Sequence, residues 1–204
     1  MKRFNRMQSS AAVAGLLLLA GSALGQSTYS LDPAHSSAQF SVRHMMVSTV
    51  RGQFTKVAGT VVYDPANPSA TQVDATIGAA SINTNNEKRD AHLRSPDFFD
   101  AAKYPTLTFK SKRAWKADGV LQLEGALTMH GVTRDVVLRV DGPTPETKDP
   151  WGNVRIGATA TTKLNRKDWG LVWNQALESG GVLVGEEISI TIDVEAVKQK
   201  PAAR

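Results

Sequence analysis

The histidines are the first residues of this sequence that could carry chemistry. The chain has four, His35, His44, His92 and His130, and it has no cysteine. No two histidines stand four residues apart, which is the spacing that presents two imidazoles to a zinc ion from one helix face. The sequence therefore predicts no metal site, although folding can bring distant residues together.

A short polar stretch gives the second set of candidates. Arg89 and His92 are three residues apart, and Asp90 and Arg94 are four apart, so on a helix each pair would share a face. A His/Asp/Arg pocket that acts on a bound ligand is the enzyme alternative. The simpler interpretation is a structural insertion that pins one end of the fold, with Asp90 and Arg94 as a solvated pair.

The motifs of common enzyme classes are missing. The sequence has neither a Gly-x-Ser-x-Gly nucleophile turn nor a phosphate-binding loop. Gly180-Gly181 precedes a strand pattern, so it does not resemble a nucleotide fingerprint. No basic stripe indicates nucleic-acid binding. The sequence thus predicts no catalytic activity, no cofactor and no nucleic-acid partner.

Most of the chain alternates between apolar and polar residues, which is the pattern of half-buried strands. Phe40, Val42 and His44 share one face of the first long strand. An imidazole on such a face is usually a hydrogen-bonded core group, but His44 is also the first choice for a polar ligand contact. Similar runs centre on residues 60–63, 73–79, 106–110, 121–127, 136–140, 154–160 and 188–194.

Two segments break the strand rhythm. Residues 1–25 combine the cations Lys2, Arg3 and Arg6 with an apolar run and a small-residue site ending at Gly25, which predicts a cleavable secretory signal peptide. Its removal would leave 179 residues and lower the net charge from +5 to +2. Residues 85–94 predict a short helix, and residues 95–99, with Pro96 at the first helical position, predict a second helical turn.

About eight antiparallel strands in meander order predict one all-β domain over residues 26–204. We expect a closed eight-stranded antiparallel barrel with a short helical insertion, because closure removes exposed strand edges. Asp118-Gly119 and His130-Gly131 are typical of tight hairpin turns. A barrel of this size holds packed side chains or one small ligand.

Five sequence blocks resemble the YceI family, in that family's order and over almost all of the mature chain. They are the segments 32–44, 50–54, 89–109, 127–133 and 164–170, of which RDAHLRSPDFF at 89–99 is the most distinctive. The resemblance implies an extended eight-stranded lipocalin-like barrel in the periplasm that binds a polyisoprenoid or another amphiphilic lipid. Transient membrane contact and a homodimer that seals the lipid site are compatible with it.

We therefore expect noncovalent binding, transport or storage of a long-chain lipid. A polyisoprenoid or isoprenoid quinone is the leading class, and a fatty acid or fatty amide is the nearest rival. A lipid-modifying enzyme and a nonspecific hydrophobic scavenger are the alternatives. The predicted ligand-binding residues, some of which would equally fill an ordinary core, are Phe40, Val42, His44, Phe54, Ile77, Arg89, His92, Phe98, Phe99, Leu107, Phe109, Leu127, Met129, Trp169 and Trp173, with Val61 and Ile190 as further lining candidates.

Overall fold

A computed structural model describes residues 25–178 and 180–200. The predicted signal peptide lies outside the described residues, apart from Gly25. Within the described chain, no helix is long and apolar enough to cross a membrane. The strands are β1 Ser27–Leu31, β2 Ser37–His44, β3 Ser48–Phe54, β4 Val57–Tyr63, β5 Gln72–Gly78, β6 Ile82–Asn83, β7 Thr106–Ala117, β8 Val120–Met129, β9 Val132–Asp141, β10 Thr147–Lys148, β11 Val154–Asn165 and β12 Val184–Lys198.

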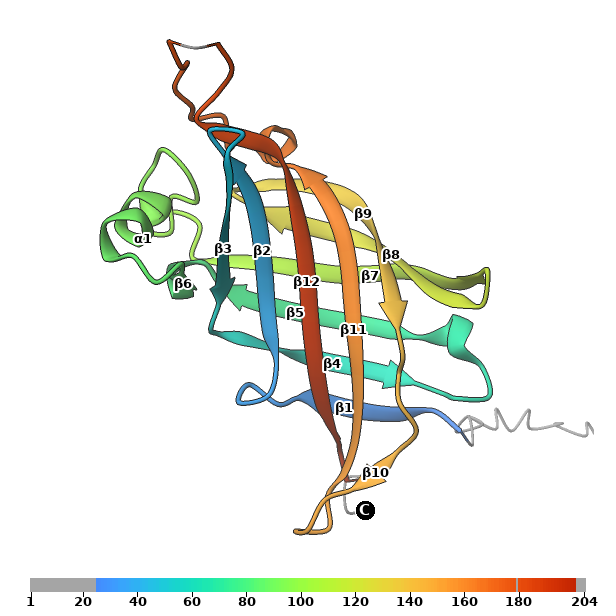
Figure 1. The fold of residues 1–204 in the computed structure, drawn as a ribbon. Helices are drawn as coiled ribbons and strands as arrows, with labels where there is room; N and C mark the ends of the chain where they lie inside the picture. The colour runs from blue at the N-terminus through green and yellow to red at the C-terminus, as the bar shows by residue number, and fades with distance from the viewer. Residues whose placement is uncertain (1–24, 179, 201–204) are drawn as a thin grey trace, which may run out of the picture.

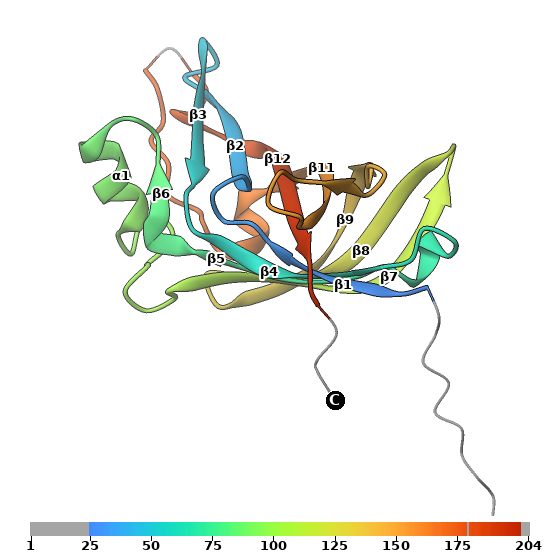
Figure 2. The same ribbon diagram turned by 90° about the horizontal axis from the view of Figure 1, so that it is seen from below.

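Eight of these strands close into an antiparallel barrel, as predicted. The ring runs β11-β9-β8-β7-β5-β4-β1-β12 and returns to β11. The long strand β12 makes closure possible, because one of its edges pairs with β11 and its other edge serves both β2 and β1. Figure 1 shows β12 and β11 crossing the full length of the molecule, and Figure 2 separates their wall from the wall of β4, β5 and β7.

The first long strands are interrupted where the barrel bends. β1 and β2 are separated by residues 32–36, and β3 and β4 by only Thr55 and Lys56. β3 continues the β12-β2 wall and ends against β6. The barrel is therefore extended beyond its closed ring, and β2 and β3 form an upright pair at one end (Figure 1).

The hairpin turns follow the local sequence. Asp118 and Gly119 have φ of 49° and 77°, and His130 and Gly131 have φ of 52° and 75°. Two left-handed residues in succession match the right-handed twist of the flanking strands. The connection between β9 and β11 contains the short strand β10, which pairs with β11.

The helical insertion is shorter than predicted. Helix α1 spans Glu87–Arg94, and the Asn86 side chain caps it by accepting a hydrogen bond from the Arg89 amide. The prediction of a second helical turn at residues 95–99 is wrong. Phe98 donates one turn-type bond to Ser95 O, but the Phe99 amide reaches back to Leu93 O, so the helical pattern does not continue. Three 3-10 turns, η1 Pro68–Ala70, η2 Ala79–Ser81 and η3 Arg166–Trp169, complete the structure.

Candidate functional site

The barrel encloses one long apolar cavity. On β12 its wall is built by Ile188, Ile190, Ile192 and Val194, which alternate with polar neighbours along the strand. Alternate residues of a strand point to the same face, so this single strand supplies a continuous apolar stripe. The other strands of the closed ring contribute to the wall, and so do β2, β3, α1 and the turn after α1.

The cavity is long and narrow. Its volume is ≈ 250 Å³, and its lining on β12 extends from Val184 to Val194, a path of roughly 30 Å at the usual rise per strand residue. The small side chains of Ala158 and Ala160 on β11 also belong to the lining. The space therefore suits an extended chain better than a compact ring system.

The polar groups of the lining are few. They are Gln39, Thr71, Thr108, Thr162 and Arg166. Among the residues that line the described cavity there is no carboxylate and no imidazole. The described lining is therefore almost entirely apolar.

Arg166 carries the one charge of the lining and directs it into the protein. Its Nε donates to Gly185 O at 2.9 Å, its Nη2 donates to Val184 O at 3.4 Å, and its Nη1 donates to Leu171 O. Burial lowers the pKa of the Arg166 guanidinium. These bonds fasten η3 to the start of β12, so Arg166 is foremost a structural clamp at one end of the cavity.

The structure places ten of the fifteen predicted binding residues in the cavity wall. Val61 and Ile190 also line it. The large side chains of the ten predicted residues lie at inward-facing strand positions or in the turn after α1. The ten are Phe40, Val42, Phe54, Ile77, Phe98, Phe99, Leu107, Phe109, Leu127 and Met129.

Two of the remaining five predicted residues, Trp169 and His44, belong to barrel elements and lie outside the cavity wall. Trp169 is buried, and its indole Nε1 donates to Leu127 O at 3.2 Å, so it belongs to the core behind the lining. His44 ends β2 opposite Val184. It lies one alternation step beyond Val42, just past the end of the lining.

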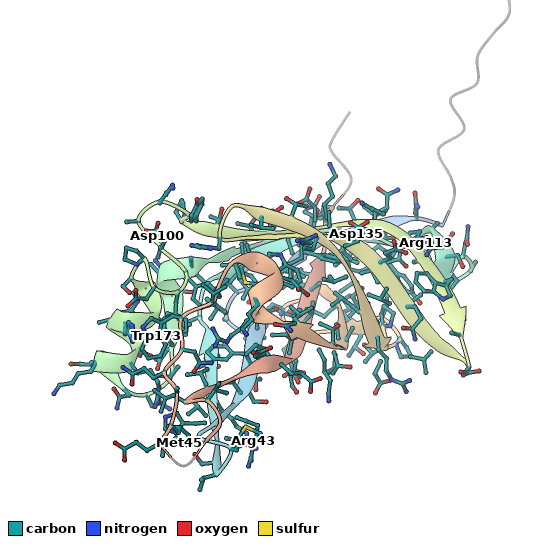
Figure 3. The ribbon with its side chains drawn as sticks, turned by 90° about the horizontal axis from the view of Figure 1, so that it is seen from above. Arg43, Met45, Asp100, Arg113, Asp135 and Trp173 are labelled. Atoms are coloured by element: carbon teal, nitrogen blue, oxygen red, sulfur yellow. The ribbon has the colours of Figure 1, made fainter. Side chains whose placement is uncertain are left out.

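The other three, Arg89, His92 and Trp173, hold the insertion in place. The Arg89 guanidinium donates to Thr84 Oγ1 at 2.7 Å and Thr84 O at 2.8 Å. The His92 imidazole pairs with Asp97 at 2.8 Å and packs edge-on against the Trp173 ring. Figure 3 shows Trp173 beside α1.

The buried Asp90 completes the attachment of α1. Its carboxylate accepts from the Thr84 amide at 2.9 Å and from the Thr84 hydroxyl. Arg94 donates to Ala80 O and Ile82 O, so the solvated Asp90–Arg94 pair expected from the sequence does not form. Arg89 and Asp90 bond to Thr84, whereas His92 pairs with Asp97, and none of the three lines the apolar cavity.

Many lining residues were missed by the sequence reasoning. Their alternation was visible, but a strand pattern does not say which face is inside, and a shift of one residue inverts the choice. The small side chains of Ala158 and Ala160 give no indication in the sequence that they line a cavity. The missed apolar lining residues are Leu31, Ala38, Val57, Val73, Ala75, Leu93, Leu121, Leu123, Val136, Leu138, Val140, Pro143, Ala158, Ala160, Leu164, Leu171, Val184, Ile188, Ile192 and Val194.

One group of described side chains has the composition of a cation site. Asp32, His35 and Glu195 bring their ligand atoms within 4.8 Å of one another. Arg155 Nη1, however, already donates to Asp32 Oδ2 and Glu195 Oε1, each at 2.6 Å. The guanidinium supplies the positive charge that these carboxylates need, so the cluster is an ion-pair network.

A second, polar depression adjoins the far end of the cavity. Its volume is ≈ 230 Å³, and it shares Leu121, Val140 and Pro143 with the apolar cavity. Lys116 and Asp141 stand at its rim as exposed groups. It offers polar surroundings next to the apolar space at the barrel end opposite the β2–β3 hairpin.

A closed eight-stranded barrel around an apolar cavity defines the chain as a lipocalin-like barrel protein. The family model of the YceI-like domain matches residues 29–196. Protein YceI of Escherichia coli O157:H7 is 36% identical over 189 residues, which cover 92% of this chain and 95% of that protein. The chain therefore belongs to the YceI-like domain family.

Solved structures have the same fold. The crystal structure of the Campylobacter jejuni YceI protein matches with a TM-score of 0.65 and 34% identity, over 78% of this chain and 90% of that one. A polyisoprenoid binding domain from Saccharophagus degradans matches with a TM-score of 0.59 and 18% identity, over 84% of this chain and 98% of that one. At 18% identity the second likeness shows the fold alone.

Proposed function

We propose that the protein binds a long-chain amphiphilic lipid in its barrel, without covalent attachment and without turnover, and carries or stores it in the periplasm. The observation that carries this proposal is the cavity, which is long, narrow and lined by apolar side chains with no carboxylate or imidazole. Catalysis on a bound chain needs a positioned acid, base or nucleophile. The described lining holds one ionisable group, Arg166, which donates to three backbone carbonyls. Its hydroxyls, on Thr71, Thr108 and Thr162, have no carboxylate or imidazole beside them in the lining to act as a base.

The energetics favour a long aliphatic tail. Each buried methylene contributes about 0.8 kcal/mol, so ten of them offer about 8 kcal/mol before the costs of association are subtracted. A polyisoprenoid or isoprenoid quinone is the leading class, supported by the polyisoprenoid binding domain with the same fold. A fatty acid or fatty amide has the same kind of tail and is the nearest rival.

The polar head of the lipid belongs outside the apolar lining. Burying an unpaired polar group in an apolar space costs several kcal/mol, so the tail fills the cavity while the head stays at a barrel end. The signal peptide predicted for residues 1–25 supports a periplasmic location for the protein. A homodimer stays a prediction.

The first experiment is mass spectrometry of protein purified from a periplasmic extract without detergent, in the native state and after organic extraction. We expect a mature chain that begins at Gln26 and carries one prenyl-chain or quinone species in near-stoichiometric amount. A mixture that changes with the host would favour the nonspecific scavenger. An empty protein that also fails to take up added polyprenol would refute lipid carriage.

A pair of variants on one strand tests the location of the lipid. Ala160 lines the cavity, whereas the next residue, Thr161, is exposed. Ala160→Phe places a ring in the tail's path and should lower lipid occupancy. Thr161→Phe adds the same ring on the outside and should leave occupancy unchanged.

A further inference from the structure

The β2–β3 hairpin carries an exposed apolar tip at one end of the barrel. Between β2 and β3 lie Met45, Met46 and Val47, with 43%, 60% and 80% of their surfaces exposed. They are three consecutive large apolar residues with no place in the core. Figure 3 shows Arg43 and Met45 together at an extremity of the molecule, away from Arg113 and Asp135.

The tip also departs from ordinary turn chemistry. The Val47 amide donates to His44 O at 3.0 Å, which closes a four-residue turn with Met45 and Met46 at its centre. Both central residues are left-handed, with φ of 52° and 60°. Such turns favour Asn-Gly, because other side chains are strained at positive φ. A sequence that accepts both strain and apolar exposure at the same place indicates selection for another purpose.

The tip is continuous with the end of the cavity. Val42, three residues before Met45, lines the cavity, and so does Val184, which pairs with His44. The Met45 amide donates to Leu183 O at 2.8 Å, which joins the tip to the loop before β12. Val172, in the segment after η3, is a further apolar residue that is 62% exposed.

The charge at the base of the tip is positive. Arg43 is exposed, and its guanidinium donates to Thr49 Oγ1 at 3.1 Å and to Met46 O at 2.6 Å. Among the described residues it forms no ion pair with a carboxylate. An apolar tip above an unneutralised cation matches the interface of an anionic bilayer, where acyl chains lie beneath phosphate groups.

We propose that the β2–β3 tip docks the protein on an anionic lipid bilayer and holds the cavity end at the membrane surface. This inference rests on the proposed function, because a tail can then slide from the bilayer into the barrel while its head stays at the polar interface. A second copy of the chain suits the β2–β3 tip less well than a bilayer does. The tip offers at most a few hundred Å², whereas a stable dimer buries about 800 Å² on each partner.

The test compares the wild type with Met45→Asn/Met46→Gly/Val47→Ser. This variant installs the residue pair that the turn geometry favours, so we expect its melting temperature to equal or exceed that of the wild type. In sedimentation with vesicles of phosphatidylethanolamine and phosphatidylglycerol, the bound fraction should fall at least tenfold. Trp151→Ser is the matched control, since Trp151 is 82% exposed and lies in the β10–β11 connection at the opposite end.

A transfer assay separates docking from lipid binding. The tip variant should take up polyprenol from vesicles at least tenfold more slowly, yet take up polyprenol dispersed from ethanol like the wild type. Arg43→Gln should reduce the preference for phosphatidylglycerol over phosphatidylcholine vesicles.

Three results would overturn the docking proposal. They are wild-type protein that does not sediment with vesicles, a tip variant that sediments like the wild type, and a tip variant that turns a wild-type dimer into a monomer. If neither protein takes up dispersed polyprenol, the proposed lipid function fails instead, while sedimentation still decides whether the tip docks.

Discussion

At the scale of single residues, one guanidinium organises the base of the barrel. Arg155 donates through Nη1 to Asp32 and Glu195, each at 2.6 Å, and through Nε to Asp149 at 2.8 Å. Hydrogen bonding to Arg155, and then to His35, holds the pKa of the Asp32 carboxyl well below its usual range. Hydrogen bonding to Arg155 lowers the pKa of Asp149 to about 2. The four residues tie β11 and β12 to the bend after β1.

The network predicts a specific acid response. A carboxyl whose pKa is depressed in the folded state stabilises the fold fully above its unfolded pKa, which is about 4, and this contribution is lost as the pH falls through the folded value. The wild-type melting temperature should therefore hold between pH 7 and 5 and then fall between pH 4 and 2. Circular dichroism melts across this range measure it.

The variant Arg155→Met gives the comparison. It leaves three carboxylates together without a cation, so we expect it to be less stable than the wild type at pH 7. The difference should shrink below pH 4, where protonation relieves the repulsion. Lys163→Met on the same strand is the control, because both partners of its ion pair with Glu187 are exposed and such a pair contributes little. Parallel pH curves for Arg155→Met and wild type would contradict the assignment.

At the scale of elements, the close contact between β7 and β8 depends on a glycine. Gly125 is buried on β8 opposite Ser111. A Cβ added to it would lie 2.6 Å from Lys110 O and would also strike the Phe109 ring. Because Phe109 lines the cavity, the absent side chain at residue 125 makes room for part of the cavity wall.

Gly125→Ala should therefore destabilise the barrel by about 1–3 kcal/mol, since a strand backbone cannot move away as a flexible side chain can. Gly157→Ala on β11 is the matched control, because its nearest heavy atom would be 3.5 Å away. Urea unfolding curves compare the two. Equal midpoints for Gly125→Ala and Gly157→Ala would show that the packing at Gly125 is not restrictive.

Local pattern predicted the elements better than it predicted the site. The alternation around Phe40 and Val42 and the turn at Asp118-Gly119 follow from side-chain period and backbone sterics, and the structure has both. Residues 95–99 have the residue types of a helix start, but the Phe99 amide bonds to Leu93 O, six residues earlier, instead of continuing a helical pattern. Whether a side chain such as Trp169 faces the cavity or the core behind it depends on tertiary packing, which one sequence does not contain.

At the scale of the whole molecule, barrel closure was predictable from the sequence, but the strand pairing that closes the barrel was not. A count of about eight strands, together with the family resemblance, predicts a closed barrel. The shared edge of β12, which pairs with β2 over Ser37–His44 and with β1 over Tyr29–Leu31, depends on contacts between residues 140 to 169 positions apart in sequence. That shared edge makes the barrel long, so the length of the cavity is a property of the assembled fold.

The length of the cavity should act as a ruler for its ligand. Each isoprene unit added to a prenyl alcohol buries more apolar area, and we expect affinity to rise at least tenfold per unit, which corresponds to about 1.4 kcal/mol. The rise should stop when the tail exceeds the roughly 30 Å wall, because further units remain in water. Calorimetric titration with alcohols of two to eight isoprene units measures the series.

Ala158→Phe, which narrows the cavity near Val194, should move the plateau to shorter chains, whereas the outward Thr161→Phe should not. Affinity independent of chain length would show that the tail does not lie along the barrel.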